Sequence, residues 1–136
     1  MTSDVSGTNN PMNVRRSDIP WQGKVAGGNG PFEDFDTPQD GIRAGLKTFL
    51  AKFHQHGART IYEAIKQYAP PEQNPTRAYA EYVAGYAGVG ADDPIDPNNL
   101  AVLEKIGEAM CWFESKSQFA LDIIKAAAAS ALGIDI

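Results

Sequence analysis

Glu114 is the carboxylate whose sequence surroundings best suit acid catalysis. It follows Met110-Cys-Trp-Phe113, the most apolar approach to any acidic residue in the chain, and it lies where a predicted helix should end. A carboxyl group beside aromatic surface loses hydration, which disfavours its charged form and raises its pKa. Such an acid can protonate a glycosidic oxygen near neutral pH. The alternative, which spacing alone favours, is a solvated glutamate at a helix end.

A second group of polar and aromatic residues lies in the first 37 residues, in the segments Asn9–Arg15, Trp21–Gly23 and Phe32–Thr37. Asparagine amides both donate and accept hydrogen bonds, which suits hydroxyl and N-acetyl groups. Aromatic faces suit the apolar face of a sugar ring. The alternative, which composition favours, is ordinary loop chemistry, with Asn-Pro turns and aromatic side chains that fill a core.

Other residues carry weaker signals. Tyr79 and Tyr82 have the spacing of a buried helix face, although a cleft wall is the alternative. His54 and His56 lie two residues apart on a predicted helix, so their side chains point in different directions and cannot share a metal ion. We therefore predict no metal site and no cofactor.

A hydrolase of the common two-carboxylate type needs a second carboxyl group about 5–9.5 Å from the acid. Asp34 and Asp36 are candidates, but they precede a predicted helix whose start would attract Asp36 in any case. A single-acid mechanism leaves both of them structural.

These residues must be positioned by an irregular segment and a set of helices. The first part of the chain lacks helical periodicity but carries Trp21, Phe32 and Phe35, more aromatic residues than a solvated tail usually has, so we expect a flexible N-terminus over residues 1–8 and then a packed segment. Short strand-like pieces are expected near Asn13–Arg15 and Phe32–Phe35, where polar and apolar residues alternate. Caps and helix breakers predict five helices, from Thr37 to Gly57, Thr60 to Pro70, Asn74 to Gly88, about Asn99 to Phe113, and Ser117 to Gly133.

Length and composition fit one globular domain. The chain has 136 residues and a net charge of -5, which argues against a nucleic-acid partner because phosphate binding needs clustered Lys and Arg. The single cysteine, Cys111, excludes a disulfide within the chain and indicates folding in a reducing cytoplasm. The first residues lack the pattern of a signal peptide and no apolar run reaches about 18 residues, so no membrane span is expected.

Several motifs together resemble a domain of bacteriophage structural proteins. Each piece is weak, but the combination is specific and covers nearly the whole chain beyond Asn9. The matching pieces are Asn10-Pro-x-Asn-x-Arg15, Trp21-x-Gly23, Phe32-x-x-Phe35, Thr37-Pro-x-Asp-Gly-Ile-Arg-Ala44, Ala69-Pro-Pro-Glu-x-Asn74, Thr76-x-x-Tyr79 and Gly88-Val-Gly-x-Asp-Asp-Pro94. That domain is similar to the lysozyme and lytic-transglycosylase superfamily, with its segments in permuted order.

The resemblance implies a mainly α, lysozyme-like helical domain over residues 9–136, with a small irregular or β-containing N-terminal segment. It implies that Glu114 is the catalytic acid. Phage relatives of this domain tend to follow the glutamate with Asn-Gly, whereas this chain has Ser115-Lys116. The residues expected to contact the glycan are Asn10, Pro11, Asn13, Arg15, Trp21, Phe32, Phe35, Tyr79, Tyr82 and Ser115.

Two functions lead, ahead of a third, a host-encoded wall-remodelling protein, which the missing signal peptide disfavours. The first is a virion-associated module, a lytic transglycosylase or muramidase, that cleaves peptidoglycan during phage infection. The alternative is a non-enzymatic virion or tail protein that retains the lysozyme-like fold, which the acidic charge and the altered residues after Glu114 favour. The expected partners are peptidoglycan glycan strands and other virion proteins. The expected location is the phage virion, after synthesis in the host cytoplasm without a signal peptide.

Overall fold

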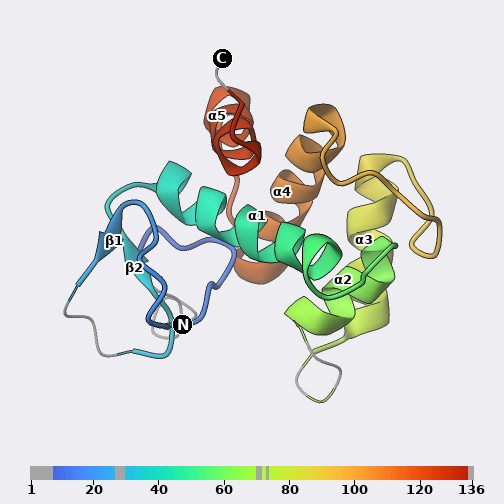
Figure 1. Cartoon of the computed structure of the whole chain (residues 1–136), viewed down its shortest axis with the longest axis horizontal. Helices are drawn as coiled ribbons and strands as arrows, with labels where there is room; N and C mark the ends of the chain where they lie inside the picture. The colour runs from blue at the N-terminus through green and yellow to red at the C-terminus, as the bar shows by residue number, and fades with distance from the viewer. Residues whose placement is uncertain (1–7, 27–29, 70–71, 73, 135–136) are drawn as a thin grey trace.

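The computed structural model describes residues 8–26, 30–69, 72 and 74–134. In these residues it contains five helices and a two-stranded antiparallel sheet, so the chain is mainly α as predicted (Figure 1). The elements are β1 (Lys24–Val25), β2 (Asp34–Phe35), α1 (Pro38–His54), α2 (Ile61–Tyr68), α3 (Thr76–Ala87), α4 (Leu100–Ser115) and α5 (Leu121–Leu132).

Helix α1 is the central element. It crosses the middle of the molecule and contacts α2, α4, α5 and strand β2 (Figure 1). Helix α3 packs against α2 and α4, and α4 packs against α5. The main core is apolar, and its largest fully buried side chains include Met12, Phe49, Ile61, Tyr79 and Leu103.

Local capping chemistry explains most helix ends. The Thr37 hydroxyl accepts from the backbone N–H of Asp40, and the Thr60 hydroxyl accepts from that of Glu63, as the two predicted caps require. Gly88 and Gly133 end α3 and α5 in the left-handed conformation, which glycine adopts without steric cost.

Two predicted helix starts are wrong. Helix α3 begins at Thr76 without a side-chain cap, so Asn74 does not cap it. Helix α5 begins at Leu121 and not after Ser117, because the Ser117 hydroxyl lies 2.8 Å from that of Ser115 and residues 117–120 connect α4 to α5 outside any helix.

The N-terminal segment packs against α1 through two glycines. A Cβ atom at Gly41 would overlap the carbonyl oxygen of Asn9, and one at Gly45 would lie 2.6 Å from Sδ of Met12. These glycines are four residues apart and therefore lie on one face of the helix. Their missing side chains let the Asn9 backbone and the Met12 side chain lie directly on α1.

The strand-like pieces expected near Asn13–Arg15 and Phe32–Phe35 are present in reduced form. Arg15 and Phe32 form an isolated antiparallel bridge, and β2 pairs with β1, a strand that the sequence did not predict. The flexible N-terminus expected over residues 1–8 falls almost entirely outside the described residues. Thr8, which is described, donates to Asp34 and accepts from the backbone N–H of Phe35.

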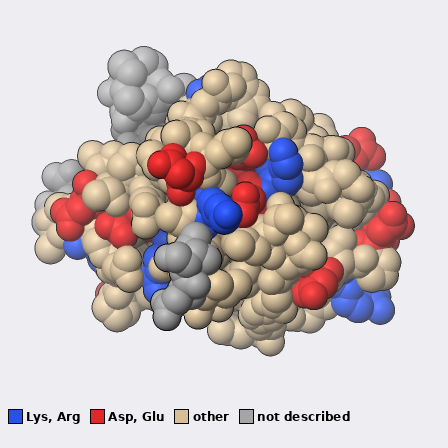
Figure 2. Space-filling model, turned by 90° about the horizontal axis from the view of Figure 1, so that it is seen from above, with Lys and Arg blue, Asp and Glu red and all other residues tan. Residues whose placement is uncertain are grey.

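The buried acid Glu33 holds this segment together. Its carboxylate accepts from the backbone N–H of Ser17 at 2.9 Å and lies 3.1 Å from the Lys24 ammonium group and 3.8 Å from Arg16. A buried carboxylate requires such partners because desolvation penalises an unpaired charge. Elsewhere, acidic and basic side chains are interspersed over the face shown in Figure 2.

Candidate functional site

Glu114 lies one residue before the end of α4, and the N-terminal segment covers its carboxyl group. The Asn13 amide donates to Oε1 of Glu114 at 2.9 Å and to its carbonyl oxygen at 3.2 Å. The Tyr79 hydroxyl, from α3, donates to Oε2 at 2.8 Å. The early Asn-Pro segment and the late glutamate therefore meet in space, although Asn13 and Glu114 are 101 positions apart in the sequence.

Burial raises the pKa of Glu114, and the hydrogen bonds from Asn13 and Tyr79 oppose that rise. Desolvation disfavours the charged carboxylate, whereas both donors stabilise it. The net effect is a carboxyl group that holds its proton to higher pH than a solvated glutamate. This is the direction that a general acid requires.

The surroundings of Tyr79 keep its hydroxyl group protonated, so that it can donate a hydrogen bond. Its ring is buried and stacks on Phe113 with the ring centroids 4.1 Å apart. Burial raises the pKa of Tyr79 well above its ordinary value, and the nearby charge of Glu114 raises it further. The hydroxyl therefore stays protonated and fixes the position of one Glu114 oxygen.

The Glu114 side chain opens onto a hollow of about 240 Å³, which we call the Glu114 hollow. The guanidinium group of Arg15 lies over the Phe32 ring, 5.2 Å from its centroid. This pair presents a cationic and an aromatic surface on the N-terminal side. The lining residues include Asn13, Arg15, Phe32, Tyr68, Asn74 and Glu114.

Asn13 reaches Glu114 from a turn that the hydrogen bonds of Asn10 hold in place. The buried Asn10 amide donates to the carbonyl oxygens of Val14 and Glu33, and its oxygen accepts from the backbone N–H of Val14. Asn13 itself has a φ of 56°, in the left-handed region that asparagine tolerates better than most residues. The Asn10 bonds therefore fix the loop that carries the Asn13 amide.

Ser115 fastens the end of α4 to the same loop. Its hydroxyl lies 2.8 Å from the carbonyl oxygen of Pro11 and 3.0 Å from that of Cys111. The next residue, Lys116, ends the helix with a φ of 56°. Lys116 therefore holds a backbone conformation that glycine accommodates best.

The predicted glycan-contacting residues divide into two groups. Asn13, Arg15 and Phe32 line the Glu114 hollow, and Tyr79 donates a hydrogen bond to the Glu114 carboxylate. The others lie elsewhere: Asn10, Pro11 and Phe35 are buried, Ser115 bonds to backbone, and Trp21 and Tyr82 line other hollows.

Two residues of this hollow, Tyr68 and Asn74, were not predicted as candidates from the sequence. The Tyr68 hydroxyl donates to the carbonyl oxygen of Met12 at 2.7 Å, which ties α2 to the N-terminal loop. Burial raises the pKa of Tyr68 well above its ordinary value. In the sequence, Tyr68 precedes Pro70-Pro71 and Asn74 follows them. The one sequence feature that could have pointed to Tyr68 as a site residue is its position at the end of a short helix, just before two helix-breaking prolines.

Cys111 and the histidines take no part in the Glu114 hollow. Cys111 is buried, and burial raises the pKa of its thiol to about 12. No three metal-binding side chains gather in the part of the chain that the structure describes. Among the helices of that part, none has the length and apolar character that crossing a membrane requires.

Comparison with known proteins relates the chain to a bacteriophage protein. No family model matches it. It is 34% identical over 85 residues to Protein P5 of Pseudoalteromonas phage PM2, and the aligned part covers 60% of this chain. The match spans about half, 53%, of the length of that relative. The predicted link to bacteriophages is thereby supported at the level of a phage-related protein.

Proposed function

We propose that this chain is a virion-associated module that cleaves the glycan of peptidoglycan, with Glu114 as the general acid. The observation that carries the proposal is the environment of that carboxyl group. It faces a hollow, burial raises its pKa, and two donors from distant parts of the chain fix its oxygens. The similarity to a phage protein supports the virion as the place of action.

In this mechanism a protonated Glu114 donates its proton to the oxygen that links N-acetylmuramic acid to N-acetylglucosamine. The bond from that oxygen to the anomeric carbon breaks as the proton arrives, and positive charge develops on the muramic acid ring. In a transglycosylase, a hydroxyl group of the same sugar attacks this carbon and returns its proton to Glu114. In a muramidase, water attacks and returns the proton in the same way.

The residues around Glu114 have separate parts in this scheme. Asn13 and Tyr79 are positioning residues that keep both oxygens in place while the proton leaves and returns. Arg15 and Phe32 offer an aromatic and cationic wall for the sugar. Asp34 accepts from Thr8 and lies 3.6 Å from Arg16, which gives it a structural part. Neither Asp34 nor Asp36 lines the Glu114 hollow, so Glu114 is the single acid among the described residues that line it.

The lysozyme-like ancestry belongs to the same proposal. Asn-Pro precedes Glu-Ser in this chain, the reverse of the order in ordinary transglycosylases, and the Ser115–Pro11 hydrogen bond joins the two motifs. A permuted lysozyme-like domain would require this meeting of distant segments. The contact supports that ancestry.

One observation favours a non-enzymatic virion protein as the second candidate. Tyr82, Tyr86, Trp112 and Leu121 are exposed and line one hollow between α3, α4 and α5. Exposed apolar side chains that gather in one place are typical of protein contacts. Such a face would suit docking within a particle, with or without chemistry at Glu114.

A lysis assay separates the two candidates. Purified protein should lower the turbidity of a peptidoglycan suspension and release soluble glycan fragments, and Glu114→Gln should abolish both. The matched control is Glu104→Gln, which makes the same change earlier on α4, away from the hollow. If the unaltered protein releases nothing, or if Glu114→Gln acts as well as the unaltered protein, the proposed chemistry is wrong.

A further inference from the structure

The Glu114 hollow has a neighbouring hollow on the same surface. A second hollow of about 340 Å³, which we call the central hollow, adjoins it. Both are lined by Asn13, Arg15 and Tyr68. The two hollows therefore adjoin at these side chains, and the central hollow is also lined by Thr48 and Lys52 of α1.

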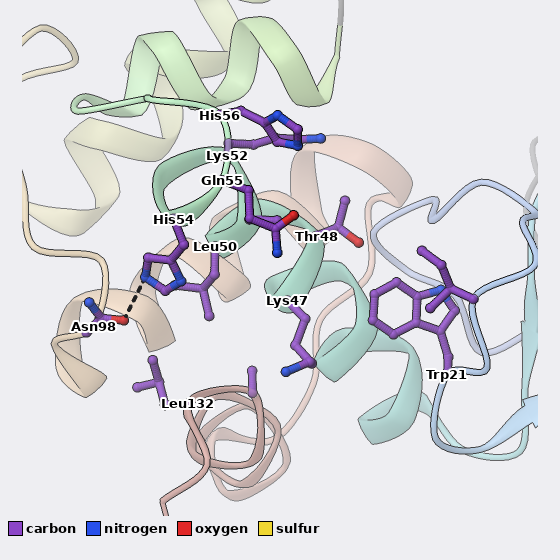
Figure 3. Close-up of a pocket in the computed structure, with 13 residues that line it drawn as sticks. Trp21, Lys47, Thr48, Leu50, Lys52, His54, Gln55, His56, Asn98 and Leu132 are labelled. Carbon is purple, nitrogen blue, oxygen red and sulfur yellow. Dashed lines mark hydrogen bonds between the residues drawn. The ribbon is translucent and has the colours of Figure 1, made fainter.

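A third hollow, of about 440 Å³, continues the series (Figure 3). We call it the lysine hollow. It shares Trp21, Thr48 and Lys52 with the central hollow. Figure 3 shows Lys47 extending toward α5, Lys52 beside His56, and the Trp21 indole across from Thr48. The three hollows thus follow one another from the end of α4 to the outer face of α1.

This path is basic in a chain that is acidic overall. The chain has 17 acidic and 12 basic residues, yet no described aspartate or glutamate lines the central or the lysine hollow. Arg16 is already held by Glu33 and Asp34. The side chains of Lys47 and Lys52 form no ion pair or hydrogen bond with the described residues, and both line the lysine hollow.

Lys52 is the more informative of the two lysines because it is half-buried. Burial lowers the pKa of Lys52, since the ammonium group loses water and gains no opposite charge from the described residues in exchange. An anion bound beside it would remove that penalty. Thr48, Gln55 and Asn98 add neutral polar groups to the same hollow, of a kind that binds amides.

We propose that the lysine hollow binds the carboxylates of the peptides that branch from a peptidoglycan strand, while the sugar chain occupies the Glu114 hollow. The inference rests on the proposed function, because it takes the strand in the Glu114 hollow as its starting point. Peptidoglycan peptides carry free carboxylates and amides together. That combination matches two lysines that have no acidic partner among the described residues and that lie beside neutral polar side chains.

The test measures binding in a Glu114→Gln background, so that no glycan is cut. The probes are soluble peptidoglycan fragments with their peptides, and the same fragments after an amidase has removed the peptides. Isothermal titration calorimetry gives each dissociation constant. The variants are Lys47→Gln and Lys52→Gln, alone and combined, and the matched control is Lys125→Gln, an exposed lysine of α5 that lines none of these hollows.

We expect peptide removal to weaken binding by about tenfold and each lysine change to weaken binding of the intact fragment by about two- to fivefold. The double variant should bind both fragments equally, and Lys125→Gln should behave as the parent does. Nuclear magnetic resonance should show the pKa of Lys52 rising when the intact fragment binds.

Two results would overturn the inference alone. One is that the lysine variants bind the intact fragment as tightly as the parent, while the peptide-free fragment still binds. The other is that poly-glutamate competes as strongly as the intact fragment, which would make the hollow a general anion site. If neither fragment binds and the unaltered protein cuts neither, the proposed function fails together with the inference.

Discussion

The hydrogen bond from Tyr79 to Glu114 makes a prediction about stability and pH. Tyr79→Phe removes only the hydroxyl that lies 2.8 Å from Oε2 and keeps the ring that stacks on Phe113. A hydrogen bond to a charged group contributes about 1.5–3 kcal/mol. Because Glu114 keeps part of its exposure, we expect a loss near the lower limit, about 1.5 kcal/mol, at pH 8.

The loss should shrink at low pH. The pKa of Glu114 is raised above its ordinary value of 4.5, so below that value the carboxyl group is neutral in both the folded and the unfolded chain. Folding stability falls as the pH rises from there through the folded-state pKa, because the folded chain gives up its proton less readily. Removing the Tyr79 hydroxyl raises the folded-state pKa of Glu114 further, so the variant loses more stability than the unaltered protein does as the pH rises. At pH 4 a neutral hydrogen bond of about half the strength remains.

Urea unfolding from pH 4 to pH 8 measures this difference in free energy. The matched control is Tyr82→Phe, because the Tyr82 hydroxyl forms no hydrogen bond with the described residues and its ring also packs on Phe113. That variant should stay within about 0.5 kcal/mol of the unaltered protein at every pH. A Tyr79→Phe difference that is constant with pH, or that keeps its full pH 8 size in a Glu114→Gln background, would refute the role of Tyr79 as a donor that stabilises the charged carboxylate.

Two further predictions concern the backbone around the site. Gly41→Ala should destabilise the fold by about 3 kcal/mol or more in urea unfolding, because the added Cβ meets the Asn9 carbonyl group. The control is Gly85→Ala on α3, where the added Cβ meets open space and should stabilise the fold by up to about 1 kcal/mol. Equal effects of the two changes would contradict the close packing on α1. Lys116→Gly should stabilise the fold by up to about 1 kcal/mol and so raise the midpoint of thermal unfolding, because Lys116 holds a φ of 56°. A lowered midpoint would show that the contacts of Lys116 with the Trp112 and Phe113 rings outweigh the backbone strain.

The sequence predicted the elements better than the site. Caps at Thr37 and Thr60 and glycines at Gly88 and Gly133 are local signals, and the structure confirms each. The predicted start of α5 was wrong, because the hydroxyl of Ser117 lies against that of Ser115, a contact that cap statistics do not contain.

At the site, Glu114 could be singled out because its apolar neighbours are adjacent in sequence. The aromatic residues could not be sorted in the same way. Trp21 and Phe35 looked as suitable for a sugar as Phe32, yet Phe35 is buried and Trp21 faces other hollows. Tyr68 reaches the Glu114 hollow only because α2 places it beside the Met12 backbone. Long-range packing, which composition does not record, decides these cases.

The bonds that join Asn13 to Glu114 and Pro11 to Ser115 bridge 101 and 104 residues. During translation the loop that carries Pro11 and Asn13 is made about a hundred residues before Glu114 and Ser115, so a nascent chain holds that loop long before it holds the carboxylate. Contacts between such distant residues form only after both segments have been synthesised, and closing the loop between them costs conformational entropy. If Glu114 cuts cell wall, the host that makes the protein is thereby spared any activity from unfinished chains.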